Sequence, residues 1–168
     1  MKSSKIKIIA EIGWNHMGNI SLAKKMIIQA KKSGADIVKF QTWSVSNLKT
    51  GSWDGDGRRD IYKKAELSEQ DYLLLKKFSD KNKIEMTTSL FNIKDYNKIK
   101  SCKFRIIKIP SHEVHNLELI KFCIKKFKIV LISTGASRWA EILKISKLPG
   151  FKKKVTLLHC VSTYPANS

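Results

Sequence analysis

Short runs of apolar residues alternate along the chain with longer segments in which apolar residues recur every three or four positions. Such runs are typical of buried β-strands, and the wider spacing is typical of the amphipathic helices that cover them. The pattern therefore predicts six strands, in this order: Ile6–Ile12, Ala35–Thr42, Ile84–Phe91, Phe104–Ile109, Ile129–Ser133 and Val155–Val161.

Helices are predicted between these strands. They are expected at Ser21–Ser33, after the cap residue Ser68, at Ile93–Ile99, and after the cap residues Asn116 and Ser137. Ser68 and Asp71 have the spacing of a capping box. The segment Trp43–Leu67 is different, because it is long, polar and rich in glycine. A loop of this length inside a compact domain is usually functional, and this one could close over a substrate.

Strands that alternate with helices, with no linker between them, predict a parallel sheet covered by helices. Two architectures remain, an open doubly wound sheet and a (β/α)8 TIM barrel. Neither a Gly-x-Gly-x-x-Gly sequence after the first strand nor a P-loop sequence is present, which weakens both nucleotide-binding versions of the open sheet. Polar residues follow every predicted strand, and a barrel builds its active site from such strand ends. We therefore expect the barrel, with about the first six βα units in this chain.

The length and composition fit one ordinary domain, which we expect to span residues 1–168. No apolar run reaches the length of a membrane span, and the apolar part of the first ten residues is too short for a secretory signal. We expect a cytoplasmic protein with no membrane partner. Three widely spaced cysteines indicate neither a disulfide framework nor a zinc site.

The net charge of +19 could indicate a polyanion partner or an anionic substrate. Lysines occur on almost every predicted helix rather than in one block, so a solvated basic surface also explains the charge. A non-catalytic, basic polyanion-binding protein therefore stays open as an alternative. Burial separates the two classes, because an active site would bring lysines together in a concavity and a polyanion binder would expose them in a stripe.

Two lysines interrupt apolar strands, Lys39 in the second and Lys108 in the fourth. A lysine in a buried strand is costly unless it meets an anion. Two such lysines favour a multiply charged anion such as a phosphate or a carboxylate. Hydroxyl groups that could surround it come from three further strand ends, at Ser89, Ser111 and Ser133. The alternative is that each lysine pairs with an acid, either Glu11 or Glu113.

Glu11 stands in the first apolar strand and could be a general base or a ligand of a sugar hydroxyl. Its alternative role is a structural partner of Lys39. The four histidines have no spacing typical of metal ligands, so each is expected to be an ordinary hydrogen-bonding residue: His16, His112, His115 and His159.

Five ordered motifs resemble those of the N-acetylneuraminate (sialic acid) synthase family, which includes the legionaminic and pseudaminic acid synthases. They are Ile9-Ala-Glu-Ile-Gly-Trp-Asn-His-Met-Gly18, Ala35-Asp-Ile-Val-Lys-Phe-Gln-Thr42, Lys108 to Glu113, Leu131-Ile-Ser-Thr-Gly135 and Leu157-Leu-His-Cys-Val-Ser-Thr-Tyr-Pro165. The resemblance covers nearly the whole chain.

The resemblance implies a metal-dependent condensation of phosphoenolpyruvate with an N-acylated mannosamine-type sugar, to give a nonulosonic acid and phosphate. It implies that Lys39 and Lys108 hold phosphoenolpyruvate and that Glu11 handles a proton on the sugar side. The other site positions that it implies are Gln41, Ser89, Ser111, Glu113, Ser133, Ser162 and Tyr164. No nucleic-acid partner is implied. A related phosphoenolpyruvate-dependent synthase of another 3-deoxy sugar acid remains a second possibility.

This chain departs from the family in two local places and in length. In the motif that begins at Lys108, Ile109-Pro110 stands in place of the commoner Gly-containing turn and His112 replaces a small residue; the third strand ends in Thr88-Ser89-Leu90-Phe91 instead of Ser-Thr-Pro-Phe. The family's barrel has eight strands, and its two metal-binding histidines come from the seventh and eighth. We therefore expect an N-terminal part of the enzyme, inactive alone. The Mn or Mg ligands, strands 7 and 8 and the C-terminal antifreeze-like domain are expected to be absent, and the full-length form is expected to be a homodimer.

Overall fold

The computed structural model describes residues 6–48 and 50–163. It confirms six strands, all parallel and in sequential order across one sheet. They are β1 (Ile9–Gly13), β2 (Ile37–Thr42), β3 (Glu85–Leu90), β4 (Ile106–Ile109), β5 (Ile129–Ser133) and β6 (Val155–Leu158).

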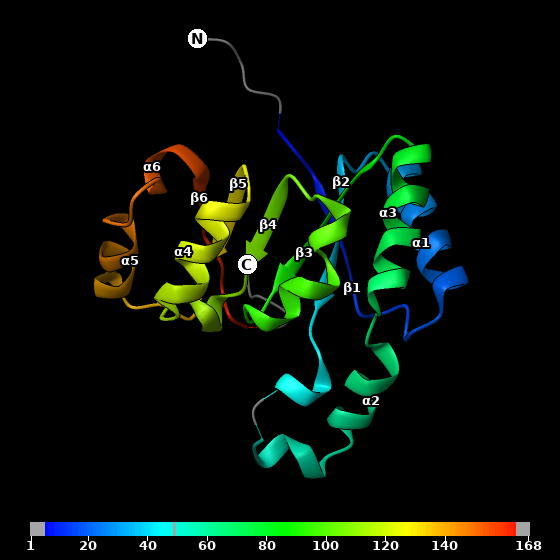
Figure 1. Ribbon diagram of the computed structural model, residues 1–168, viewed down its shortest axis with the longest axis horizontal. Coiled ribbons are helices and arrows are strands. Elements are labelled where there is room, and N and C mark those ends of the chain that lie inside the picture. Colours follow the sequence, from blue (N-terminus) through cyan, green and yellow to red (C-terminus); the bar gives the residue numbers. More distant parts are fainter. Residues whose placement is uncertain (1–5, 49, 164–168) are drawn as a thin grey trace.

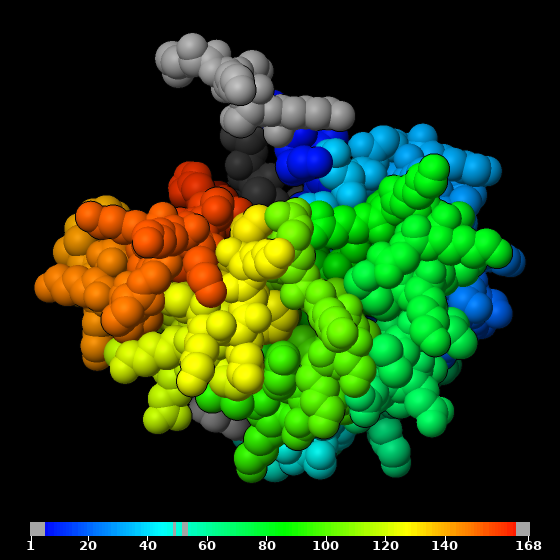
Figure 2. All heavy atoms as spheres, turned by 45° about the horizontal axis from the view of Figure 1, so that its top comes forward, coloured from blue at the N-terminus to red at the C-terminus, as the bar shows by residue number. Residues whose placement is uncertain are grey.

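The connections between the strands carry the helices, which flank the sheet (Figure 1). The α-helices are α1 (Ile20–Lys32), α2 (Arg58–Ala65), α3 (Glu69–Lys81), α4 (Leu117–Lys126), α5 (Trp139–Ser146) and α6 (Phe151–Lys154). Short 3₁₀ turns cover Val45–Asn47, Ser52–Gly55, Lys94–Lys98, Lys100–Cys102 and Ser111–Glu113. In the space-filling view the colours pass from blue and green through yellow to orange across the molecule. Successive strand–helix units therefore lie side by side (Figure 2).

Alternation along the strands separates two apolar layers. Of every two consecutive residues in a strand, one side chain faces the helices and joins a large core that includes Val38, Phe40 and Ile107. The other faces the inner side of the sheet, where Ile37, Ile106 and Leu131 form a smaller cluster. Lys39 and Lys108 each lie two residues beyond a member of this inner cluster, so both lysines share its face.

Two predicted helix caps are confirmed. The Ser68 hydroxyl accepts a hydrogen bond from the Asp71 amide, and the Asp71 carboxylate accepts from the Ser68 amide at 2.9 Å. The Asn116 side chain accepts from the Leu119 amide at 3.1 Å. A side-chain cap of this kind contributes about 0.5–2 kcal/mol to a helix.

Other sequence-based boundaries were wrong. Helix α5 begins after Arg138 rather than Ser137, because the Glu141 carboxylate accepts from the Arg138 amide at 2.7 Å and fixes the first turn there. Strand β6 ends at Leu158, three residues before the predicted end. The lysine run before β6, Lys152–Lys154, belongs to the short helix α6.

The segment predicted as a long loop after β2 contains a helix of its own, α2, and two 3₁₀ turns. This segment, residues 43–67, is called the excursion below. It leaves the sheet at the end where the strands finish (Figure 1). The sequence hides α2 because its first turn follows three glycines in a polar stretch, a pattern typical of loops.

Candidate active site at the carboxyl ends of the strands

The carboxyl ends of the strands and the loops that follow them enclose a cavity of about 780 Å³. Its lining combines residues from all six strand ends with one residue of α2. It is lined by Glu11, Gly13, Trp14, Asn15, Lys39, Gln41, Tyr62, Ser89, Phe91, Lys108, Pro110, Ser111, His112, Ser133, Ala136, Cys160, Val161 and Ser162. This is the main cavity.

Lys39 is the buried cation of the main cavity, with 3% of its surface exposed. Its Nζ atom lies 2.5 Å from Glu11 Oε2 and donates to Ser89 Oγ at 2.8 Å. Burial lowers the pKa of Lys39, whereas the Glu11 carboxylate acts in the opposite direction and Lys108 adds to the lowering. The expected alternative for Glu11, an ion pair with Lys39, is therefore present.

Lys108 is the half-buried cation opposite Ser89, its register partner across β3 and β4. Burial lowers the pKa of Lys108, and the charge of Glu11 works against that shift. Within residues 6–48 and 50–163, no carboxylate lies within ion-pair distance of this ammonium group. A partly desolvated cation without an acid partner is suited to bind an anionic ligand.

The first strand ends in a turn that leaves room for a ligand. Gly13 adopts φ +58°, and a Cβ atom there would lie 3.3 Å from Glu11 Oε1, 3.7 Å from Gln41 Nε2 and 3.9 Å from Asn15 Nδ2. Three polar groups therefore meet at a position that only a glycine leaves free. One carboxylate and two amides offer both hydrogen-bond acceptors and donors, as a polyhydroxylated ligand requires.

The other side of the cavity depends on a close approach between the loops after β5 and β6. A Cβ atom on Gly135 would lie 2.6 Å from Ser162 Oγ and 2.9 Å from the Cys160 carbonyl oxygen. The Thr134 amide and hydroxyl both donate to the Leu158 carbonyl, at 3.1 and 2.9 Å. These contacts place Ser133 and Ser162 on the same wall.

The structure brings most of the predicted site residues together and separates one. Those that line the main cavity are Glu11, Lys39, Gln41, Ser89, Lys108, Ser111, Ser133 and Ser162. Glu113 is not among these lining residues, because its carboxylate turns to the start of α4 and accepts from Asn116 Nδ2 at 2.9 Å. Glu113 is therefore no partner of Lys108. Tyr164 lies outside the described residues.

An aromatic wall, not predicted from the sequence, closes one side of the main cavity. Four of its rings line the cavity, those of Trp14, Tyr62, Phe91 and His112, and Trp43 packs against Tyr62 and Phe91 behind them. Tyr62 meets Trp14 and Trp43 edge to face, with centroids 6.0 and 5.6 Å apart, and His112 stacks on Phe91 at 5.6 Å. Aromatic residues are common in cores and carry no specific chemical signal in a sequence; the one available indication was that Trp14, Trp43 and Phe91 directly follow strands.

A smaller cavity of about 240 Å³ lies behind this wall. It is called the side pocket. It shares four lining residues with the main cavity, and the rest come from the excursion. Its lining consists of Gln41, Trp43, Leu48, Arg58, Tyr62, Phe91 and His112.

The excursion is tied to the connection between β3 and β4 by partly buried polar contacts. The Asp95 carboxylate accepts from Ser44 Oγ at 2.6 Å and from Asn47 Nδ2 at 2.8 Å. Lys98 Nζ binds the Glu66 carboxylate at 2.5 Å and the Trp43 carbonyl at 3.0 Å. One lysine thus joins the beginning and the end of the excursion, which fixes the aromatic wall on the rigid sheet.

The divalent metal implied by the resemblance does not fit the residues seen in this structure. Among the described side chains, no three of His, Cys, Asp or Glu converge to hold an ion. His16 is buried in the turn after β1, where its Nδ1 accepts from the Gly18 amide at 3.0 Å, and His112 belongs to the aromatic wall. His115 and His159 are exposed and lie outside the main cavity lining.

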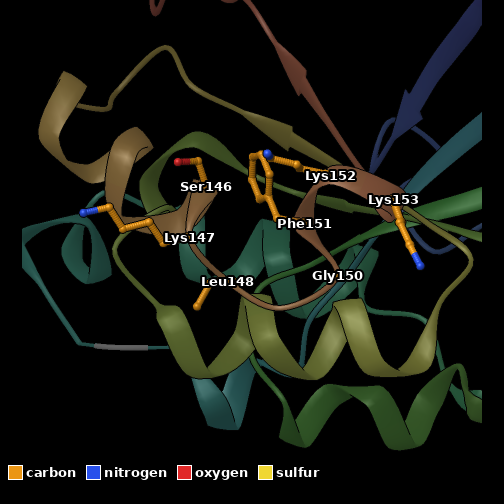
Figure 3. A pocket seen from close by; sticks show the side chains of 7 residues that line it. All are labelled: Ser146, Lys147, Leu148, Gly150, Phe151, Lys152 and Lys153. Atoms are coloured by element: carbon orange, nitrogen blue, oxygen red, sulfur yellow. The ribbon is translucent and has the colours of Figure 1, made fainter.

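A separate hollow of about 730 Å³ lies between the end of α5 and α6. Lys147 and Lys153 extend away from it in opposite directions, and Phe151 and Leu148 supply its apolar surface (Figure 3). Its lining contains no acid, histidine or cysteine. The chemistry therefore concentrates in the main cavity. None of the described helices is long and apolar enough to cross a membrane.

Comparison with known proteins identifies relatives of this chain. The chain is 35% identical to the N,N'-diacetyllegionaminic acid synthase of Campylobacter jejuni and 33% identical to that of Legionella pneumophila, over 96% and 95% of its own length. It covers 53% and 50% of those proteins, so it spans about half the length of these relatives. The crystal structure of the N-acetylneuraminic acid synthetase of Leptospira borgpetersenii, in complex with citrate, superposes with a TM-score of 0.88 at 33% identity, over 98% of this chain and 57% of that one.

The parallel sheet is thus the one found in sialic acid synthases with TIM barrels, and the profile of the NeuB family matches residues 26–168. With that match added to the two lysines at the strand ends, the chain belongs to the NeuB family of sialic, legionaminic and pseudaminic acid synthases.

Proposed function

We propose that this chain provides the phosphoenolpyruvate site of a synthase that condenses phosphoenolpyruvate with an N-acylated mannosamine-type sugar. The products are a nonulosonic acid and inorganic phosphate. The observation that carries the proposal is the convergence of Lys39 and Lys108 in one cavity, with Lys108 unpaired among the described residues.

The charges of the cavity fit this substrate. Phosphoenolpyruvate carries a carboxylate and a phosphate, and the two ammonium groups can each meet one of them. Ser89, Ser111 and Ser133 line the same space and supply neutral hydroxyl donors. Ser89 already accepts from Lys39, so its hydroxyl hydrogen is free to point at the ligand.

The proposed reaction balances without a redox partner. The C3 carbon of phosphoenolpyruvate bonds to the aldehyde carbon of the sugar, and the aldehyde oxygen takes a proton. Water adds to C2 and loses a proton, and the C2–O bond to phosphate then breaks to leave the keto acid. Glu11, exposed to the cavity beside Gln41 and Asn15, is the group that moves a proton or holds a sugar hydroxyl.

The divalent metal and the homodimer implied by the resemblance stay proposals for an enzyme of the relatives' length. In such an enzyme Mn or Mg would polarise the aldehyde. No step of the proposal uses this chain's residues as metal ligands, since the described ones do not form such a cluster.

The polyanion-binding alternative is less well supported. It requires an exposed stripe of lysines, whereas the two strand lysines meet inside a cavity and one of them is 3% exposed. A synthase of another 3-deoxy sugar acid would use the same phosphoenolpyruvate site and would differ in the sugar it accepts.

The first test replaces the unpaired cation. Lys108→Ala in the 168-residue chain should weaken phosphoenolpyruvate binding, measured by calorimetry, by on the order of 2–5 kcal/mol, the usual effect of removing one partner of a desolvated charge pair. Lys125→Ala, at the exposed end of α4, removes the same charge away from the cavity and should leave the Kd unchanged. Equal binding by the two folded variants would refute the assignment.

A further inference from the structure

The connections that lead into β4 and β5 enclose a hollow of about 370 Å³, which is lined by residues within 96–105 and 126–128 and is called the basic hollow. It lies at the amino ends of the strands, the end at the top of Figure 1 that comes forward in Figure 2. Arg105 precedes β4, whereas Lys108 lies near the other end of that strand. The basic hollow and the main cavity share no lining residue.

Cations dominate the lining of the basic hollow. Five of its nine lining residues are Lys or Arg and none is an acid, whereas Lys and Arg make up 33 of the 168 residues of the chain, about one in five. The five cations are Lys100, Lys103, Arg105, Lys126 and Lys128. The general abundance of lysine therefore does not account for the hollow, and an anion placed there would relieve the repulsion between these groups.

Most of these cations lack an acid partner. Arg105 donates to the Glu85 carboxylate through Nε at 3.0 Å and Nη2 at 2.9 Å. In the described part of the chain, no carboxylate lies within ion-pair distance of the four lysines. A neighbouring hollow of about 350 Å³ shares Lys103 and Arg105, but Asp80 and Glu85 line it and pair with Lys76 and Arg105. The positive charge at this end is therefore least compensated in the basic hollow.

Beneath the cations the basic hollow has an apolar floor. Ile99, Phe104 and Phe127 line it and are buried. Lys126 is held above the rings, because its Nζ atom lies 5.9 Å from the ring centroid of Tyr96 and 6.0 Å from that of Phe122. The other three lysines are exposed at the rim. The hollow thus combines an apolar base with ammonium groups that can converge on one ligand.

Size and charge together restrict the ligand. A volume of about 370 Å³ falls in the range of about 300–1,000 Å³ that is typical of small-molecule sites. A single phosphate carries at most about two negative charges, fewer than the unpaired cations of the basic hollow. A chain of phosphates joined by anhydride bonds gathers more charge in the same small space, and lysine binds phosphate as a point charge.

We propose that the basic hollow binds a condensed phosphate, the phosphoanhydride chain of a nucleoside triphosphate or of an inorganic polyphosphate. The lysines at the rim bind the phosphate groups. A nucleoside would in addition place its base on the apolar floor, whereas an inorganic chain would use the rim alone. This site is independent of phosphoenolpyruvate binding at the opposite end of β4.

The experiment removes two cations of the basic hollow. Calorimetry measures the Kd of inorganic triphosphate, adenosine triphosphate and inorganic phosphate for the 168-residue chain carrying Lys108→Ala, which reduces anion binding in the main cavity. Adding Lys126→Gln with Lys128→Gln should raise the Kd of both triphosphates by about tenfold or more, because hydrogen bonds to charged groups are lost. Inorganic phosphate should bind much more weakly than triphosphate.

The matched control is Lys121→Gln with Lys125→Gln, which removes the same charge from exposed positions of α4 outside the hollow lining. It should leave both Kd values almost unchanged. Equal losses in the two double variants would overturn the proposal, because the basic surface as a whole would then attract the ligand. Failure of both triphosphates to bind, or inorganic phosphate binding as tightly as they do, would overturn it too.

A second double variant guards against misfolding. If the loss of Lys126 from the rings unfolds the chain, Lys100→Gln with Lys128→Gln replaces the first pair and should raise the Kd of the triphosphates to the same extent. Tighter binding of adenosine triphosphate than of inorganic triphosphate would assign the site to nucleotides, and equal binding would assign it to the inorganic chain. Phosphoenolpyruvate binding to a chain with intact Lys108 should be the same with and without the Lys126 and Lys128 changes.

Discussion

At the scale of single residues, the contact between Lys39 and Glu11 controls the charge of the main cavity. Lys39 is buried and Glu11 is about half exposed, with 49% of its side chain accessible. Desolvation lowers the pKa of Lys39, and Glu11 is the strongest influence in the other direction. The Glu11 carboxylate therefore opposes, in part, the effect of burial on the charge of Lys39.

The effect of Glu11 on the pKa of Lys39 can be tested through the pH dependence of phosphoenolpyruvate binding. Glu11→Gln keeps the shape but removes the charge that raises the pKa of Lys39. As the pH rises, Lys39 should then lose its proton at a lower pH than it does in the unaltered chain. The pH above which phosphoenolpyruvate binding weakens should move to a lower value than in the unaltered chain, measured by calorimetry over neutral to alkaline pH.

Glu113→Gln is the matched control, because Glu113 contacts Asn116 outside the main cavity lining. It should leave the pH profile in place. An identical profile for Glu11→Gln would mean that Glu11 does not set the charge of Lys39, whatever its part in proton transfer.

The polar site residues could be predicted from the sequence better than the apolar ones. A lysine inside an apolar strand, such as Lys39, is rare enough to indicate a function by itself. Phe91 and Tyr62 gave no such signal, since aromatic residues are common in cores. The position of Glu113 outside the cavity lining follows a 3₁₀ turn directly after Pro110, which no local pattern revealed.

At the scale of elements, the excursion is held against the turn after β1 by one very close contact. A Cβ atom on Gly18 would lie 2.2 Å from the Lys64 carbonyl oxygen near the end of α2, and Gly18 adopts φ +77°. The same turn carries the buried His16, whose ring packs on Phe40 at 5.7 Å. A glycine therefore lies where the end of α2 packs on the turn after β1.

Gly18→Ala should lower the free energy of unfolding by more than the backbone strain alone, which is about 1–3 kcal/mol for a residue in this region. The added cost comes from displacing α2. Denaturant unfolding measures the stability, and limited proteolysis should show faster cleavage within residues 43–67.

Gly57→Ala measures the cost of backbone strain alone. Gly57 also has a positive φ, +83°, but an added Cβ atom there would have nothing within 4 Å. It should cost only the strain and leave the packing of α2 against Gly18 intact. Equal losses of stability in the two variants would show that the contact with Lys64 is unimportant.

Elements were predicted well where one local rule decided them. The apolar runs identified all six strands, and the hydroxyl and amide caps at Ser68 and Asn116 were found because each makes a contact within three residues. The short helix α2 depends on distant contacts instead. Arg59 donates to Asp54 at 2.7 Å and to the Val45 carbonyl at 3.2 Å, and such contacts are invisible to a local pattern.

At the scale of the whole molecule, the sheet of the described residues has two edges. Strand β1 pairs only with β2, and β6 pairs only with β5. Exposed apolar side chains gather near the second edge, on α5, β6 and the residues that follow: Trp139, Leu143, Leu157 and Val161. Unpaired strands beside apolar surface tend to associate, whereas the charge of +19 opposes association.

The 168-residue chain should therefore associate more strongly as the salt concentration rises, because salt screens the repulsion between copies. Sedimentation velocity at low and high ionic strength measures this. Leu157→Lys, on β6, should reduce association, whereas Leu74→Lys, equally exposed on α3, should have little effect. A chain that stays monomeric at high salt would show that the edge is protected.

The origin of the side pocket walls bears on how this enzyme family diversifies. Trp43, Leu48, Arg58 and Tyr62 all come from the one continuous excursion, whereas Lys39 and Lys108 belong to strands. A single segmental exchange between homologous genes would replace most of the lining and leave the lysines untouched. Asp95 and Lys98 lie outside the excursion and hydrogen-bond to it. An exchanged segment would therefore have to keep the groups that bind these two residues.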